Sequence, residues 1–325
     1  MRKISLVLIS LVLVGFGAGV LAQASELPDP GMLPDSPFYF LKRLSEGIGT
    51  LFTFGDLAKA ERHTQLASKR LAEAKALVEK GREDIGEKVL ARYQEQLERA
   101  LNKAQQAGVR GKSIVEVTEV VTETTVKHLS VLEEVLDRVP EQTRGAIERA
   151  REVSMTGQKS ALRALAWENP ERATEINLKA VESKLNRAKA KAEQGEIEDM
   201  EEAIRGFENQ NRFGEEISQI AQAVGKDITV LEQLVGRATS VHLEILSEVY
   251  EKVPEQAREA IEKAMEVSIR GHERAIEVLK KGLEEAPETL ERILEEMPED
   301  VLSPIERIPQ EVRQKIQERV REEKD

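Results

Sequence analysis

Cysteine is absent from this 325-residue chain, and aromatic residues make up only 3% of it. The lack of cysteine excludes a disulfide framework, a lipidated N-terminal cysteine and thiolate metal ligands. No long apolar stretch follows the first 21 residues, so the sequence predicts no transmembrane helix beyond them. Packing between regular elements must therefore hold the fold together.

Catalytic motifs are absent as well. The chain has no Gly-x-Ser-x-Gly elbow, no phosphate-binding glycine loop, no His-Glu-x-x-His zinc motif and no calcium loop. Pairs of carboxylates are uninformative because the chain contains 60 Asp and Glu residues. We therefore expect no enzyme, no catalytic residue and no cofactor.

Charged residues are abundant instead, at 33% of the chain, with a net charge of -12. Glu, Lys and Arg alternate at helical spacing, which is typical of long solvent-exposed helices and coiled coils. An acidic surface disfavours nucleic-acid phosphates and anionic lipids, because both are bound by clustered Lys and Arg. We expect no nucleic-acid partner, and membrane contact only through an uncleaved N-terminal anchor.

The N-terminus has the pattern of a secretory signal. Arg2 and Lys3 precede an apolar run over residues 4–21, which ends in the small-x-small triplet of residues 22–24. Cleavage after Ala24 would make Ser25 the new N-terminus, whereas an uncleaved run would be an anchor. Both alternatives predict a secreted or cell-surface protein.

The chain contains an internal duplication. Moving it along itself by 114 residues places residues 128–165 on residues 242–279, and 20 of these 38 positions are identical. The same offset extends upstream to about Asp56. The repeated unit thus covers residues 56–168 and again residues 169–283.

Glycine and proline divide each copy into four predicted helices. Asp56 is the expected N-cap of the first helix, and Gly81 or its counterpart Gly195 supplies the left-handed residue that ends it. Asn169 is expected to cap the second copy, directly before a proline. We expect the two copies to be joined rigidly.

The later helix boundaries also recur in both copies. Ser113 and Asp227 occupy one repeat position and are the expected N-caps of the third helix. Pro140 and Pro254 end that helix and open the fourth. Apolar residues along the third helix recur at steps of three and four, the spacing of one buried stripe.

These patterns predict an all-α fold of two tandem four-helix units. The domain division is a signal peptide over residues 1–24, a lead segment with a short helix over 25–55, the two units, and a proline-punctuated charged tail over 284–325. The sequence does not separate two side-by-side bundles from one extended helical array.

The four histidines are the candidates for metal ligands. His63 aligns with Asn177 and His272 with Gln158, so those two positions require only a polar group. His128 and His242 do correspond, but neither follows a Glu three residues earlier, as di-iron bundle sites require. These two remain the metal candidates, against a role as hydrogen-bonded core residues.

The lead segment occurs once and lies outside the repeat. It reads Leu-Pro-Asp-Ser-Pro-Phe-Tyr-x-Leu-Lys-Arg from Leu33 onward, with Asp35 or Ser36 expected to cap a helix over about 37–47. Phe38, Tyr39, Leu41 and Leu44 are predicted to form the apolar side of this helix. They either plug the first bundle as a lid or dock a partner.

This lead, followed by the helix over residues 66–81, resembles a family of uncharacterised domains in exported and cell-surface proteins of prokaryotes. The resemblance covers about residues 33–139, and the second copy shares it only through the duplication. It implies a secreted helical domain of unknown function, with no catalytic residue to carry over.

Export, duplication and absent chemistry together favour a non-enzymatic structural or interaction module for an unknown protein partner at the cell envelope. The alternative is an extracytoplasmic metal-binding, small-ligand-binding or stress-chaperone protein that uses His128 and His242 or the acidic faces.

Overall fold

The computed structural model describes residues 27–285, 308–310 and 312–316, so the expected signal peptide and most of the tail lie outside the described residues. Within these ranges the regular structure is entirely helical. The helices are α1 (Tyr39–Leu51), α2 (Asp56–Glu79), α3 (Glu83–Val109), α4 (Val115–Leu136), α5 (Glu141–Glu168), α6 (Pro170–Gln194), α7 (Ile197–Ala223), α8 (Thr229–Lys252) and α9 (Glu255–Glu285). No helix in the described parts is both long and apolar enough to cross a membrane.

The two copies repeat helix by helix. Helices α2 to α5 begin at residues 56, 83, 115 and 141, and α6 to α9 begin at residues 170, 197, 229 and 255. Each pair of starts differs by 114 residues, the offset of the sequence repeat. The predicted all-α fold with two tandem four-helix units is confirmed.

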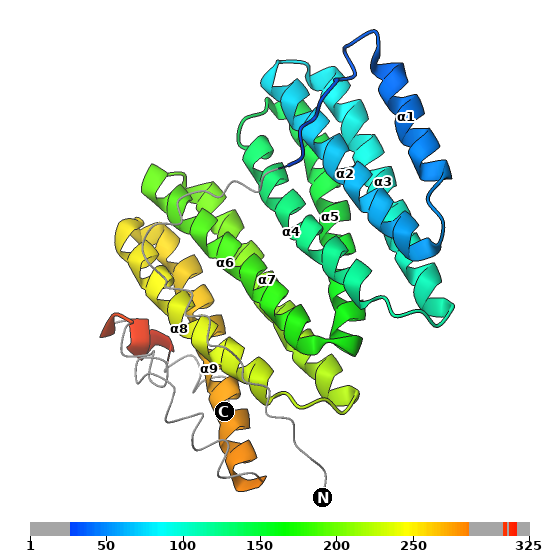
Figure 1. The fold of residues 1–325 in the computed structure, drawn as a ribbon. Coiled ribbons are helices and arrows are strands. Elements are labelled where there is room, and N and C mark those ends of the chain that lie inside the picture. The colour runs from blue at the N-terminus through cyan, green and yellow to red at the C-terminus, as the bar shows by residue number, and fades with distance from the viewer. Residues whose placement is uncertain (1–26, 286–307, 311, 317–325) are drawn as a thin grey trace, which may run out of the picture.

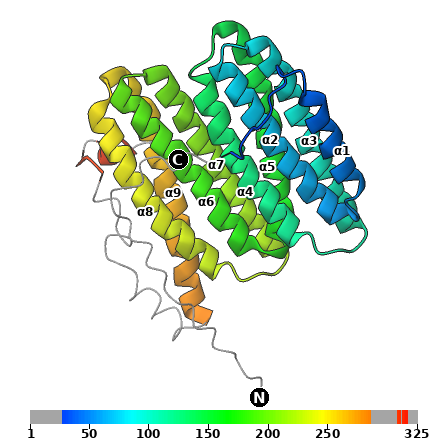
Figure 2. The same cartoon turned by 45° about the horizontal axis from the view of Figure 1, so that its top comes forward.

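The copies form one continuous array of helical hairpins (Figures 1 and 2). Helices α2 and α3, α4 and α5, α6 and α7, and α8 and α9 pair, and each hairpin packs on the next in chain order. The boundary between the copies is therefore one more hairpin-to-hairpin contact. Of the two arrangements that the sequence left open, the structure has the extended array, with α1 alone beside α2 at one edge.

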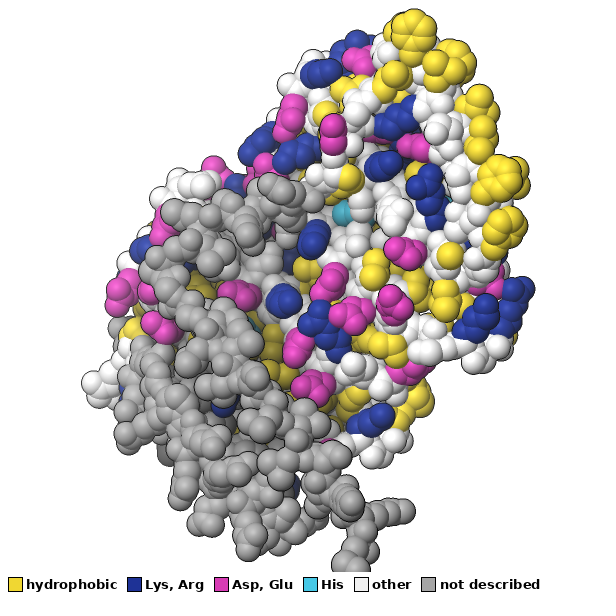
Figure 3. All heavy atoms as spheres, in the orientation of Figure 1, with side chains coloured by type: hydrophobic (Ala, Val, Ile, Leu, Met, Phe, Trp, Pro, Cys, Tyr) yellow, Lys and Arg dark blue, Asp and Glu magenta, His cyan; other side chains and the backbone are white. Residues whose placement is uncertain are grey.

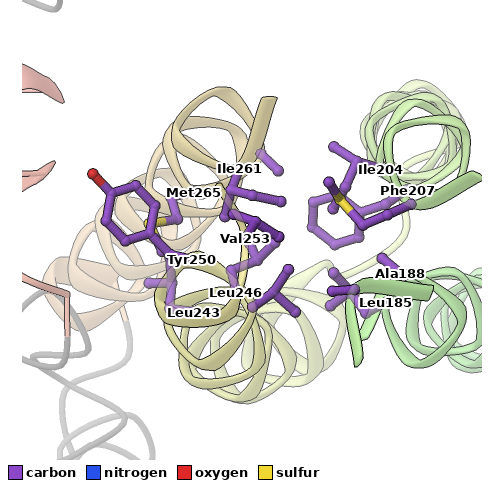
Figure 4. Close-up of a cluster of buried hydrophobic side chains, with 14 of the residues drawn as sticks. Leu185, Ala188, Ile204, Phe207, Leu243, Leu246, Tyr250, Val253, Ile261 and Met265 are labelled. Atoms are coloured by element: carbon purple, nitrogen blue, oxygen red, sulfur yellow. The ribbon is translucent and has the colours of Figure 1, made fainter. Parts of the chain in front are cut away.

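Each copy has its own apolar core, built from the same repeat positions on its four helices. The first core contains Leu71, Tyr93, Leu132 and Ile147, one from each of α2 to α5. The second contains their counterparts Leu185, Phe207, Leu246 and Ile261, which converge in Figure 4. Burying such side chains stabilises a fold by about 1.5–3 kcal/mol each, so these clusters hold the hairpins together.

A third cluster joins the two copies. Leu162 and Leu165 of α5 pack against Ile176 of α6 and against Phe213 and Ile217 of α7. All five side chains are at most 4% exposed. The junction is therefore an apolar core in its own right, which supports the expected rigid connection.

Ion pairs extend this junction along α4 and α6. Arg172 reaches Glu119 and Glu123 at 2.6 Å each, and Arg187 reaches Asp137 at 2.7 Å. These pairs fix how α6 lies against α4.

The helix ends agree with the glycine predictions. Gly81 and Gly195 have φ angles of 67° and 73°, and the next amide donates to a carbonyl of the last helical turn in both places. The Asn169 Oδ1 atom accepts from the Arg172 amide at 3.1 Å and caps α6 as expected. Helix α5 also approaches α3 closely at Gly157, where an added Cβ would lie 3.2 Å from Leu101.

Three predicted N-caps are wrong. Gly55 is the N-cap of α2, while the Asp56 carboxylate pairs with Lys103 of α3 and with Arg110 just after it. The N-caps of α4 and α8 are the residues after Ser113 and Asp227. The Ser113 hydroxyl bonds to Glu168, and Asp227 accepts from the Thr229 amide at 2.9 Å from one position before the cap. Asp56 and Ser113 thus bond to charged side chains that are distant in sequence.

The described part of the tail docks on the second copy. Ile308, Val312 and Ile316 are at most 3% exposed and join the core beside α8 and α9. These residues cover the edge of the array opposite to α1 (Figure 1).

Candidate docking site on helix α1

A tight turn places α1 against the first copy. Gly31 has a φ of 60°, and its amide donates to Asp29 at 2.7 Å. Leu33 is buried, and the Ser36 amide donates to its carbonyl at 3.0 Å. Lys42 on α1 donates to the carbonyls of Pro30 and Met32, so the lead segment and α1 form one folded piece.

Charged and polar side chains attach α1 to α2. Glu73 of α2 is fully buried and accepts from the Tyr39 hydroxyl at 2.7 Å and from Lys42 at 2.6 Å. Arg70 of α2 pairs with Glu73 and with Glu46 and donates to the Tyr39 hydroxyl at 2.9 Å. We call these five residues the α1 anchor. Because the charges are buried together, each depends on the others to offset its lost hydration.

The electrostatics of the anchor follow from this burial. Burial, together with the hydrogen bond to Glu73, raises the pKa of Tyr39 to about 12, so its hydroxyl stays protonated. Burial alone lowers the pKa of Arg70, but the adjacent Glu73 raises it overall. Tyr39 therefore remains a hydrogen-bond donor to Glu73, and Arg70 remains charged over the ordinary pH range.

The other side of α1 and its flanks is apolar and faces solvent. Figure 3 shows hydrophobic side chains in a row along this edge of the molecule. The residues are between 48% and 79% exposed, and we call them the apolar ridge: Phe38, Phe40, Leu41, Leu44, Ile48, Leu51, Phe52 and Phe54. A ridge of this size is rare on a monomer surface without a binding role.

The structure separates the four residues that the sequence placed on one apolar side. Tyr39 points into the anchor, whereas Phe38, Leu41 and Leu44 lie on the ridge. An apolar lid plugging the bundle is therefore wrong, because α1 covers α2 through its polar side. The expected cap is only partly present, since the Ser36 hydroxyl accepts from the Phe38 amide at 3.3 Å but α1 begins at Tyr39.

Sequence reasoning missed most of this site. The anchor residues Tyr39, Lys42 and Glu46 follow one another at steps of three and four, which identifies a polar stripe on one helix face. Phe40, Leu44 and Ile48 repeat every four residues on another face. Separating these two stripes would have shown that the apolar side faces away from Tyr39.

The histidines lie in the core rather than in a ligand cluster. His128 is 1% exposed, its Nε2 lies 2.9 Å from the Ser68 hydroxyl, and its ring meets the Tyr93 ring edge-on. His242 meets Phe207 in the same way. Burial lowers the pKa of each to about 3. The part of the chain that the structure describes contains no group of three His, Cys, Asp or Glu placed to hold a metal.

The other two histidines sit in polar pairs that the duplication explains. The His63 Nδ1 lies 2.9 Å from Gln96, and in the second copy their counterparts Asn177 and Gln210 bond to each other at 2.7 Å. His272 lies 3.1 Å from the Thr239 hydroxyl. A hydrogen-bonding group is what these positions have in common.

The fold and its exposed edge define an all-α protein whose first helix is held by a polar anchor and exposes an apolar ridge. Residues 31–142 match the model of a family described as a domain of unknown function (DUF5667). The match covers the lead segment, α1 to α4 and the first residues of α5. No curated protein and no solved structure matches the chain.

Proposed function

We propose that this protein is a non-enzymatic structural and interaction module that works outside the cytoplasm. In this proposal the hairpin array is a rigid body and the apolar ridge on α1 is its attachment surface at the cell envelope. The ridge carries the proposal, because exposing four phenylalanines costs solubility unless they bind something.

The α1 anchor supports this function. A helix that only filled space would turn its apolar side toward the protein, as the hairpin helices do. Here a buried network of five polar and charged residues holds the polar side inward and so presents the apolar side outward. A rigid, outward-facing helix is also the geometry that a docking surface needs, because little conformational entropy is lost on binding.

Site-specific photo-crosslinking in cells tests the proposal. A benzoylphenylalanine in place of Phe40 puts the reactive group on the ridge with little change in shape. We expect it to crosslink to an envelope component, protein or lipid, and we expect Leu44→Glu to abolish the crosslink because a carboxylate would be buried in the contact.

The matched control is the same crosslinker at Trp167, which lies on α5 and is 58% exposed, as Leu44 is. The control should give no specific product. Equal products from both positions, or none from Phe40, would rule out the ridge as an attachment surface. Circular dichroism of the Leu44→Glu protein should match the parent, since the side chain is on the surface.

A further inference from the structure

Charge is distributed unevenly along the array. Residues 27–112, which contain α1 to α3, carry 15 Lys and Arg against 12 Asp and Glu, a net charge of +3. Residues 113–325 carry 31 Lys and Arg against 47 Asp and Glu, a net charge of -16. The apolar ridge therefore lies at the basic end of a protein that is otherwise acidic.

Basic side chains flank the ridge. Arg43 lies on α1, and Lys59, Arg62 and Lys69 lie on α2; we call these four the basic rim. The Arg62 guanidinium reaches under α1, within 3.0 Å of where a Cβ on Gly49 would be. Within the described ranges none of the four forms an ion pair; Arg43 is exposed, and Lys59, Arg62 and Lys69 are partly exposed.

The size of the ridge fits insertion into an interface. Its four phenylalanines are each 58–79% exposed, and a ring buries about 150–250 Å², so they alone expose on the order of 500 Å². Helix α1 has 13 residues, which gives a length of about 20 Å. It is thus too short to cross a hydrocarbon core of about 30 Å but long enough to lie along its surface.

We propose that the apolar ridge and basic rim bind the surface of an anionic lipid bilayer, with α1 parallel to the membrane plane. This inference rests on the proposed attachment function and names its target. The ridge enters the boundary between headgroups and acyl chains, while the rim contacts lipid phosphates. Two copies meeting through α1 fit less well, because they would bring two basic rims together.

Vesicle flotation of the protein that begins at Ser25 tests this target. The probes are vesicles of phosphatidylcholine alone and vesicles of an equal mixture of phosphatidylcholine and phosphatidylglycerol. We expect binding to the mixed vesicles to exceed binding to the neutral ones about tenfold or more and to weaken with added salt, since each Lys or Arg near the surface contributes to attraction.

Two variants separate the contributions of ridge and rim. Leu44→Glu combined with Ile48→Glu should abolish binding to both vesicles, and Arg62→Gln combined with Lys69→Gln should reduce binding to the mixed vesicles about tenfold or more. The matched controls are Trp167→Glu and Lys179→Gln, two exposed positions far along the chain, and neither should change binding. All proteins begin at Ser25, so the apolar run over residues 4–21 contributes to none of these measurements.

The outcomes distinguish this inference from the proposed function. Binding that ignores lipid charge, or that survives the ridge variant, overturns the lipid target. If vesicles do not bind while the Phe40 crosslinker captures one discrete protein, the attachment function stands and its target is a protein. A dimer in analytical ultracentrifugation that Leu44→Glu dissociates would instead identify a second copy as the occupant.

Discussion

The same repeat positions carry arginines at the edge of the array in the first copy and apolar residues in the junction core in the second. Arg62 and Arg99 stand where the second copy has Ile176 and Phe213. Arg99 is exposed on α3 and Arg62 is partly covered by α1, whereas Ile176 and Phe213 are at most 4% exposed against α5. Their surroundings explain the difference, since the edge of an array needs polar residues where an inner layer needs apolar ones.

The positions that hold α1 make a second comparison. Arg70 and Glu73 correspond to Lys184 and Arg187, which pair with Glu133 and Asp137 of α4. Helix α1 therefore occupies, beside α2, the place that α4 occupies beside α6. Only one helix fills the edge layer, whereas every inner layer has two, and the outer side of that helix is the apolar ridge.

Exchanging residues between the edge of the array and the junction should have the largest effect on the free energy of unfolding. Ile176→Arg removes an apolar side chain from the junction and leaves an unpaired charge there, so we expect it to lower the free energy of unfolding by at least about 4 kcal/mol. The reciprocal Arg62→Ile should change it by less than about 1 kcal/mol. Urea unfolding followed by circular dichroism measures both, and equal effects would mean that the junction is not a core.

Breaking the α1 anchor should have the next largest effect on the free energy of unfolding. Glu73→Gln removes one of the two carboxylates that pair with Arg70 and also removes the ion pair of Lys42. Because Arg70 is only 2% exposed, we expect a loss of about 3 kcal/mol in the free energy of unfolding. Limited proteolysis should then cut near α1 before it cuts the hairpins.

The control for the anchor is Glu134→Gln, which breaks the partly exposed pair with Lys75. We expect this change to cost less than about 1 kcal/mol, because solvent screens the pair. Similar losses for the two variants would show that the anchor contributes no more than a surface ion pair.

Most of the fold could be predicted because its signals are local or duplicated. Gly81 and Gly195 end their helices through backbone conformation alone, and the offset of 114 residues fixed the correspondence of all eight helices. Asp56 and Ser113 were wrongly predicted as caps because their side chains bond to residues that are distant in sequence. The sequence also did not distinguish two separate bundles from one array, because the difference depends on contacts between the copies.

The candidate docking site on α1 could be predicted only in part, because its orientation depends on residues distant in sequence. Net charge summed over the chain disfavoured anionic surfaces, but summation hides the basic end on which α1 lies. The composition of the lead segment showed that α1 is amphipathic, and the usual rule turns the apolar side inward. Arg70 and Glu73, far along the chain on α2, reverse that orientation.

Lowering the pH should destabilise the parent protein more than the His128→Gln variant. The pKa of His128 is lowered to about 3, from an ordinary 6.5. Between these values the unfolded state binds the proton and the folded state does not, so stability falls as the pH falls, by up to about 1.4 kcal/mol for each pH unit. Urea unfolding at about pH 6 and about pH 5 should show that His128→Gln reduces this loss by about 1 kcal/mol.

The smallest expected effect on stability concerns position 93, a core position where the copies differ by a single hydroxyl. The Tyr93 hydroxyl bonds to Ser154, whereas the counterpart Phe207 leaves Ser268 to donate to the Ala264 carbonyl at 3.1 Å. Tyr93→Phe should cost about 0.5–1 kcal/mol, because Ser154 can bond to its own helix as Ser268 does. Phe207→Tyr should cost about the same or more, since its new hydroxyl must find a partner in a packed core. Urea unfolding measures the free energy of unfolding of both variants. If either variant is more stable than the parent, the hydrogen bond to Ser154 does not explain why the two copies differ at this position.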